Sequence, residues 1–175
     1  AHNGGRFDAI VGQALFDLLR IPDAIQALRP LLRDRGLWYL PIHFDGVTAF
    51  EPPHDSGLDG RIETLYHESM TTDHDDGRAG DQSGRRLLTH LRDAGSTLLE
   101  AGGSDWIVWP QDGDYPADEA YFLYHILHFI ENELRGHPAL DDDAFADWLS
   151  DRRRQIHEGR LTYIAHQLDV LARPD

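Results

Sequence analysis

Four polar residues stand at the ends of two apolar runs near the start of the chain. Gln13 and Asp17 close one run, and His43 and Asp45 close the next. The Gln13 amide can both donate and accept hydrogen bonds toward a ligand, or instead cap its own loop. His43 has a side chain that titrates near neutral pH, so it is a candidate general base, with a hydrogen-bonded strand-end histidine as the alternative. Asp17 is a second candidate ligand contact or a helix cap.

These residues share one edge only if the runs are neighbouring parallel strands. The run 7–15 is almost continuously apolar, which is typical of a strand covered on both faces. Residues 21–35 carry leucines at helical spacing, with Pro22 in the first turn and Gly36 as a stop. The aromatic run 37–44 then precedes Asp45-Gly46, a turn signal. We predict a right-handed β-α-β unit, whose strand ends meet where α/β sheets bind ligands.

The rest of the chain is predicted to alternate helices and strands within a single domain, 1–175, because no linker or repeat divides it. Residues 51–83, rich in Pro, Gly, Asp and Ser, form a lid-like excursion around a short helix. The expected elements are helices over 61–70, 85–94, 116–135 and 141–158, a strand over 96–109 with a bulge at Gly102-Gly103, and a terminal strand from Leu161 in which 164–171 could continue as helix. Helix 116–135 is apolar all round and should be largely buried.

The amino-acid composition excludes several classes of partner and of chemistry. The chain has 31 acidic residues against 16 basic ones, all of them Arg, which gives a formal charge of −15. Such a surface repels phosphate backbones and anionic lipids, so nucleic acid and membranes are not expected partners. The acidity has two explanations, genome base composition and adaptation to high salt in a halophile. Cysteine is absent, which excludes disulfides and thiolate chemistry, and no apolar run is long enough for a membrane span. We expect a cytoplasmic protein.

A second set of residues has side chains suited to an acceptor molecule. Tyr66, His67 and Met70 lie on the predicted lid helix, where aromatic and sulfur atoms can contact a cation or a flat ring. Asp105 and Trp106 follow the double glycine and can line the same cleft. Ordinary packing is the alternative for each of them.

Two other classes of function stay open. A His/Asp metal-binding domain would use His125 and His128, three residues apart on a predicted helix, with His166, or a cluster of His67, His74, Asp75 and Asp76. A non-catalytic α/β interaction module could present the basic run 151–155 to an acidic partner, although these arginines also complement a helix dipole.

The order of elements and two sequence stretches resemble the second half of a class I S-adenosylmethionine-dependent methyltransferase. "FDAIVGQALFDLL" is similar to that family's fourth strand and the turn after it, and "IQALRPLLRDRGLWYL" to its next helix and fifth strand. The resemblance implies a Rossmann-like α/β fold with helical insertions. It also implies S-adenosylmethionine as cofactor near Gln13 and Asp17, a small-molecule acceptor near Tyr66, His67, Met70, Asp105 and Trp106, and His43 as the catalytic base.

One departure from the family affects the expected activity. The glycine-rich loop after the first strand and the acidic residue ending the second, which form most of that family's cofactor site, have no counterpart here. The resemblance therefore implies a C-terminal fragment that is inactive by itself. Such a fragment would leave the strand 7–15 at an open sheet edge and self-associate through it.

Overall fold

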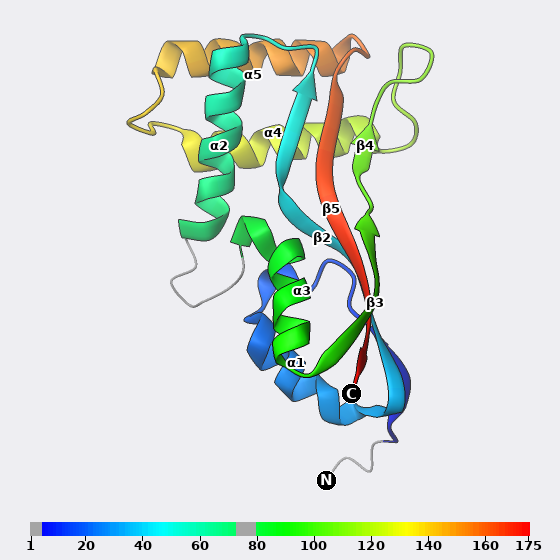
Figure 1. The fold of residues 1–175 in the computed structure, drawn as a ribbon. Coiled ribbons are helices and arrows are strands. Elements are labelled where there is room, and N and C mark those ends of the chain that lie inside the picture. The colour runs from blue at the N-terminus through cyan, green and yellow to red at the C-terminus, as the bar shows by residue number, and fades with distance from the viewer. Residues whose placement is uncertain (1–4, 73–79) are drawn as a thin grey trace. The chain divides into compact units, whose positions relative to one another are not determined.

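Strands and helices alternate along the chain in the computed structural model, which describes residues 5–72 and 80–175 (Figure 1). The strands are β1 (Phe7–Val11), β2 (Leu32–Glu51), β3 (Ser96–Gly103), β4 (Trp106–Val108) and β5 (Thr162–Pro174). The α-helices are α1 (Ile21–Leu28), α2 (Ser56–Thr72), α3 (Ser83–Asp93), α4 (Glu119–Leu134) and α5 (Asp142–His157), with short 3-10 turns at Phe16–Leu18, Arg29–Leu31 and Gly80–Gln82. None of the described helices has the length and apolar character of a membrane span.

The residues group into two compact units, where the sequence predicted one domain. Unit 1 comprises residues 1–46, 70–105 and 166–175, and unit 2 comprises residues 47–69 and 106–165. The units are not separated by a linker, which is the signal that sequence reasoning looks for. Instead β2 and β5 each contribute residues to both units.

Unit 1 contains a sheet in the order β1-β2-β5-β3. β1 and β2 are parallel, which confirms the predicted β-α-β unit, and β3 and β5 are antiparallel. Helices α1 and α3 pack against each other and on one face of this sheet (Figure 1). The core between helices and sheet consists of Phe16, Ile21, Ile25, Leu32, Trp38, Leu40, Leu87, Leu91, Val170 and Ala172.

The prediction that the first strand is covered on both faces is wrong. Ile10 pairs with Trp38 on the helix-covered face of the sheet, where Trp38 is fully buried. Val11 pairs with Tyr39 on the other face, and these side chains are 63% and 43% exposed. β1 is therefore an edge strand with one open face, and its apolar composition does not by itself report burial.

The second strand is longer than predicted. It begins at Leu32, directly after the 3-10 turn that ends the α1 region, so the expected helix 21–35 stops early. It also continues through Asp45-Gly46 to Glu51, because Gly46 takes a positive φ of 77° within the strand instead of making a turn. The Asp45-Gly46 pair therefore predicted an unusual backbone conformation correctly, but it did not mark the end of β2.

The predicted bulge at the double glycine is also displaced. Gly102 and Gly103 pair in register with Asp169 and Leu168, whereas the irregularity falls between Leu98 and Glu100. The strand 96–109 is divided into β3 and β4 after Gly103.

Unit 2 contains β4 paired antiparallel with the first part of β5, together with α2 as far as Ser69, α4 and α5. Helices α4 and α5 pack against each other. The expectation that helix 116–135 is largely buried is wrong: α4 buries one stripe, Leu123, Leu127, Ile130 and Leu134. Tyr121 and Phe129 are 66% and 51% exposed. One face of α4 is therefore buried and the other exposed, although both faces carry apolar residues.

Candidate functional site

The candidate site lies in unit 1, where β1 ends and the chain turns toward α1. The backbone after β1 stays bound to β2, since Gly12 N donates to Tyr39 O at 3.0 Å and Ala14 N to Pro41 O at 3.2 Å. Between them, Gln13 is exposed and makes no side-chain hydrogen bond with another described residue. Gln13 is thus the polar side chain at this edge that is free to contact a ligand.

A glycine allows the turn to fold back on itself. A Cβ on Gly12 would lie 2.9 Å from the ring of Phe16, which is fully buried in the core. Such a separation is below any normal carbon contact. The absence of a side chain at position 12 therefore serves the packing of Phe16.

His43 lies beneath this turn and is fully buried. Its Nε2 accepts from the backbone N–H of Phe16 at 3.4 Å, so Nδ1 carries the proton and donates to Leu40 O at 3.2 Å. Burial lowers the pKa of His43, against the opposing effect of the nearby Asp17 carboxylate. A neutral imidazole with both nitrogens bonded holds the turn on β2. Its role as general base stays a prediction that requires the ring to leave these partners.

Asp17 faces α3 across the same edge. Its Oδ1 accepts from Ser83 Oγ, and Ser83 Oγ also lies 3.1 Å from Phe44 O. Burial raises the pKa of Asp17, and the hydrogen bond from Ser83 opposes this effect. Its predicted contact with a cofactor stays a prediction.

Asp45 joins β2 to the start of α3. Its Oδ1 accepts from the backbone N–H of Arg85 at 2.8 Å and from Arg85 Nε at 2.9 Å. The first backbone N–H groups of a helix lack partners within the helix, so a carboxylate supplied by β2 fixes where α3 begins. The prediction that His43 and Asp45 follow the end of a strand is wrong, because both lie within β2, which continues to Glu51. The side chains of Asp17, His43 and Asp45 hold elements together, and that of Gln13 does not.

The predicted acceptor residues are divided between the two units. Tyr66 and His67 of α2 and Trp106 of β4 belong to unit 2, and Met70 and Asp105 belong to unit 1. Tyr66 is 8% exposed, and burial raises its pKa to about 12. Trp106 stacks on Phe122 with ring centroids 4.3 Å apart. The acceptor role of all five residues stays a prediction.

The metal-binding alternative gains no support from the described residues. No group of three or more His, Cys, Asp or Glu side chains within residues 5–72 and 80–175 could hold an ion. His128 Nε2 instead bonds Asn132 Nδ2 at 2.9 Å, and His166 Nδ1 bonds Asp105 at 2.6 Å. His74, Asp75 and Asp76 lie outside the described residues.

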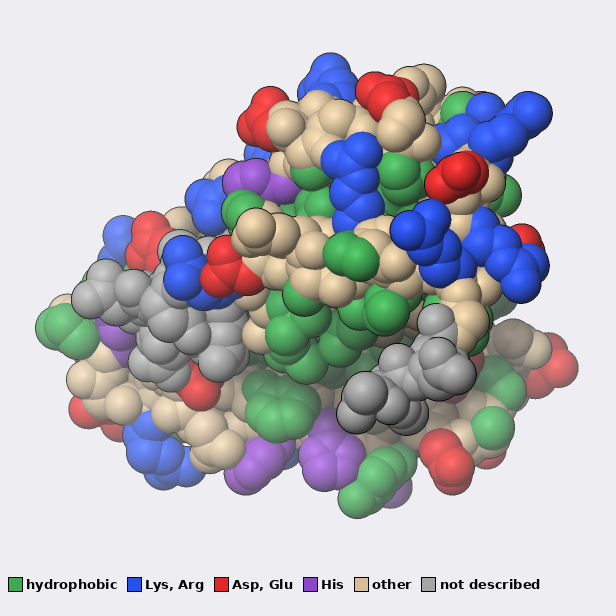
Figure 2. Space-filling model, turned by 90° about the horizontal axis from the view of Figure 1, so that it is seen from below, with side chains coloured by type: hydrophobic (Ala, Val, Ile, Leu, Met, Phe, Trp, Pro, Cys, Tyr) green, Lys and Arg blue, Asp and Glu red, His purple; other side chains and the backbone are tan. Residues whose placement is uncertain are grey.

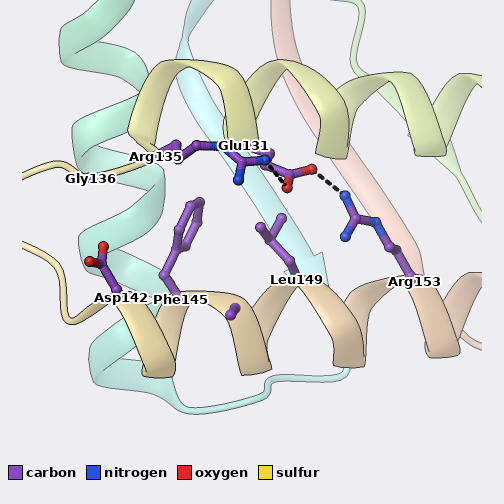
Figure 3. Close-up of a pocket in the computed structure, with 8 residues that line it drawn as sticks. Glu131, Arg135, Gly136, Asp142, Phe145, Leu149 and Arg153 are labelled. Carbon is purple, nitrogen blue, oxygen red and sulfur yellow. Dashed lines mark hydrogen bonds and ion pairs between the residues drawn. The ribbon is translucent and has the colours of Figure 1, made fainter.

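Unit 2 contains a hollow of about 350 Å³ between α4 and α5, which sequence reasoning did not find (Figure 3). Phe145 and Leu149 form an apolar floor. Above them the Glu131 carboxylate accepts from Arg135 on one oxygen and from Arg153 on the other. Since both carboxylate oxygens are already paired with cations, we interpret this hollow as a helix-helix contact rather than a binding site.

Glu63 of α2 should make the stability of unit 2 depend on pH. Burial, and then the neighbouring Asp59 carboxylate, raise the pKa of Glu63 from 4.5 to about 7. A carboxyl whose pKa is higher in the folded state favours folding at low pH, and this contribution is lost as the pH rises from about 4.5 to about 7. Because the group is partly exposed, we expect a loss of about 1 kcal/mol in the free energy of unfolding.

The test is urea unfolding of Glu63→Gln between pH 4.5 and pH 8. The variant should lose this pH dependence and be more stable than the parent above pH 7, whereas Glu68→Gln, an exposed position on the same helix, should keep it. Parallel stability curves for the parent and Glu63→Gln would contradict the assignment.

No family model and no curated protein matches the sequence. Solved structures do match the fold. The chain aligns with a proposed type II methyltransferase from Anaeromyxobacter dehalogenans at a TM-score of 0.55 and 15% identity, over 98% of this chain and 67% of that one. A proposed methyltransferase from Bacillus halodurans C-125 gives 0.45 and 13%, over 98% and 66%. Mycolic acid cyclopropane synthase CmaA1, complexed with SAH and CTAB, gives 0.41 and 10%, over 98% and 57%.

These comparisons concern the fold alone, since the identities are low. The mixed α/β fold with a sheet and helices, as predicted, is confirmed. The chain spans about two thirds or less of the length of the solved structures that it matches.

Proposed function

We propose that this chain is the second half of a class I S-adenosylmethionine-dependent methyltransferase acting on a small molecule. The observation that carries the proposal is the parallel β1-α1-β2 unit built from the stretch 5–44, the same stretch that resembles the fourth and fifth strands of that family. The likeness of the whole fold to the proposed type II methyltransferase supports it.

The residues present fit only part of the cofactor's requirements. A glycine-rich turn must leave its backbone open to the ligand. At Gly12 the space is filled by Phe16, and at Gly84 a Cβ would lie 2.9 Å from His43 O, so neither glycine leaves an open cradle.

When bound, S-adenosylmethionine supplies an electrophilic methyl group, and transfer needs little beyond positioning and removal of a proton. In this chain Gln13 would contribute hydrogen bonds at the strand edge. His43, Asp17 and Asp45 fix the turn and α3 that hold Gln13 in place.

The unpaired edge of β1 is the second reason to propose a larger sheet, because β1 is the last strand in the order β1-β2-β5-β3. Beside this edge, Val11 and Tyr39 form an apolar pair on the open face that α1 and α3 do not cover. We propose that the edge and the open face are covered either by the first half of the fold in a longer protein or, in the chain alone, by a second copy of the chain.

Titration of S-adenosylhomocysteine tests the proposal. We expect binding to a polypeptide extended at its N-terminus by about 100 residues, the length of a half-domain, and little or none to the 175-residue chain. In the longer polypeptide Gln13→Ala should weaken binding by about threefold to tenfold, the effect of one lost hydrogen bond. Gln26→Ala, at an exposed position on α1, is the matched control.

Light scattering on the same two polypeptides tests how the open face is covered. The short chain should self-associate and the longer one should not. If neither polypeptide binds S-adenosylhomocysteine, the methyltransferase proposal is wrong and the alternative of a non-catalytic interaction module takes its place.

A further inference from the structure

Arginines gather around one hollow of unit 1, far along the strands from the candidate site. The hollow measures about 530 Å³ and is lined by Arg6, Arg29, Arg33 and Arg35, together with Asp34 and Asp175 and the apolar Pro30, Leu32 and Pro174. Four of the sixteen arginines of a chain with a net charge of −15 thus line one hollow. Figure 2 shows the face of the molecule seen from below, where Arg side chains, in blue, are interspersed with acidic and hydrophobic ones.

An excursion of β2 places two of these arginines. Phe7 of β1 pairs with Leu32, but Ala9 pairs with Leu37, so the segment 33–36 bulges out of the strand. Arg35 at its tip has a φ of 68°, in the left-handed region that only glycine adopts without cost. Bulges re-aim side chains, and a strained non-glycine residue within one is a reason to look for a function.

The positive charge in the hollow is only partly neutralised. The terminal nitrogens of Arg29 donate to Ala94 O and Asp175 O, which fixes this guanidinium on the wall of the hollow. Arg35 is exposed and has no ion pair with a described residue. A hollow with a fixed guanidinium on its wall and a free one at its rim is organised to receive an anion.

The two remaining arginines have weak partners. Arg6 meets Asp34 at 3.4 Å, with the Asp34 side chain 99% exposed, and Arg33 meets Asp8 at 2.7 Å, with that side chain 82% exposed. Exposed pairs of this kind contribute little and exchange readily. A multiply charged ligand can therefore compete for these guanidinium groups.

We propose that this hollow binds a compact, phosphate-bearing small molecule. Guanidinium groups match phosphate oxygens with paired, charge-assisted hydrogen bonds. An extended polyanion such as a nucleic acid is disfavoured because the chain outside the hollow is strongly negative. The proposal is independent of methyl transfer, since it uses neither Gln13 nor the acceptor residues.

Calorimetric titration of inorganic pyrophosphate into the 175-residue protein at low ionic strength tests the site. The parent should bind, and Arg35→Gln should weaken binding about tenfold, the effect of losing one charge-assisted contact. Arg6→Gln should also weaken the binding of pyrophosphate. Arg86→Gln is the matched control, because Arg86 is an exposed residue of α3 in the same unit and does not line the hollow.

Each other outcome overturns the proposal. No binding of pyrophosphate by the parent would show that the hollow is not an anion site. Equal losses in Arg35→Gln and Arg86→Gln would show that only net charge matters. Citrate binding as tightly as pyrophosphate would show that the arginines do not select phosphate.

Discussion

Arg152→Met should lower the free energy of unfolding by about 3 to 5 kcal/mol, because it breaks a buried ion pair and leaves the partner carboxylate without its cation. Arg152 is fully buried in unit 2. Its NH2 donates to Asp59 Oδ1 at 2.6 Å, and its NH1 donates to Pro52 O at 2.6 Å and to Gln155 Oε1 at 2.8 Å.

The surroundings of Arg152 increase the cost of removing it. Its guanidinium lies 5.5 Å from the ring centroid of Phe50 and 5.3 Å from that of Trp148, which adds cation–π attraction at a buried position. Asp59 also accepts from Trp148 Nε1 at 2.6 Å and from the backbone N–H of His54 at 3.0 Å. The network therefore ties α2, which carries Tyr66 and His67, to α5.

Urea unfolding measures the effect, with Arg154→Met as the control. Arg154 is on the same helix, its side chain is 62% exposed, and its pair with Asp151 should contribute less than about 1 kcal/mol. Adding Asp59→Asn to Arg152→Met removes the orphaned charge and should recover about 1 kcal/mol or more. Equal effects of Arg152→Met and Arg154→Met would refute the buried network.

The position of Arg152 in the sequence indicates that its side chain is buried, although the basic residues around it suggest an exposed helix end. The run 151–155 looks like a basic helix end. Helical spacing, however, places Arg152 on the same face as the apolar Phe145, Trp148, Leu149 and Ile156, all buried. A charged residue in phase with an apolar stripe predicts a buried ion pair, but its partner on α2 depends on tertiary packing and cannot be read from local pattern.

The difference between local pattern and tertiary packing also explains which parts of the fold could be predicted. Residues 7–44 contain a strand, a helix and a strand in alternation, so the parallel pair β1-β2 followed from order and periodicity. The continuation of β2 past Gly46 depends on pairing with β5, which lies more than 100 residues away. Local turn residues cannot report such distant pairing.

The candidate site shows which side-chain properties could not be predicted from the sequence. Sequence order predicted Gln13, Asp17, His43 and Asp45 at the ends of two strands, but His43 and Asp45 lie within β2, which continues to Glu51. Residue type could not distinguish the exposed Gln13 from the fully buried His43. That difference arises from Phe16, which folds over His43 because position 12 is a glycine.

Gly84→Val should lower the free energy of unfolding by about 3 kcal/mol, the upper range for overpacking. Gly84 is the second residue of α3, and a Cβ there would lie 2.9 Å from His43 O, 3.1 Å from Asp45 Cβ and 3.2 Å from Leu168 Cβ. The nearest atom belongs to the backbone of β2, so relief requires α3 itself to move. That movement would also pull Ser83 from Asp17.

Gly102→Val makes the same chemical change with the opposite expectation. Gly102 is at an exposed position of β3, nothing described lies within 4 Å of a Cβ there, and valine favours strands. Urea unfolding should give unchanged or slightly higher stability for this control. If Gly84→Val were equally well tolerated, α3 would not be packed against the middle of β2 and β5, and Asp17, Asp45 and Ser83 would not hold the start of α3 in place.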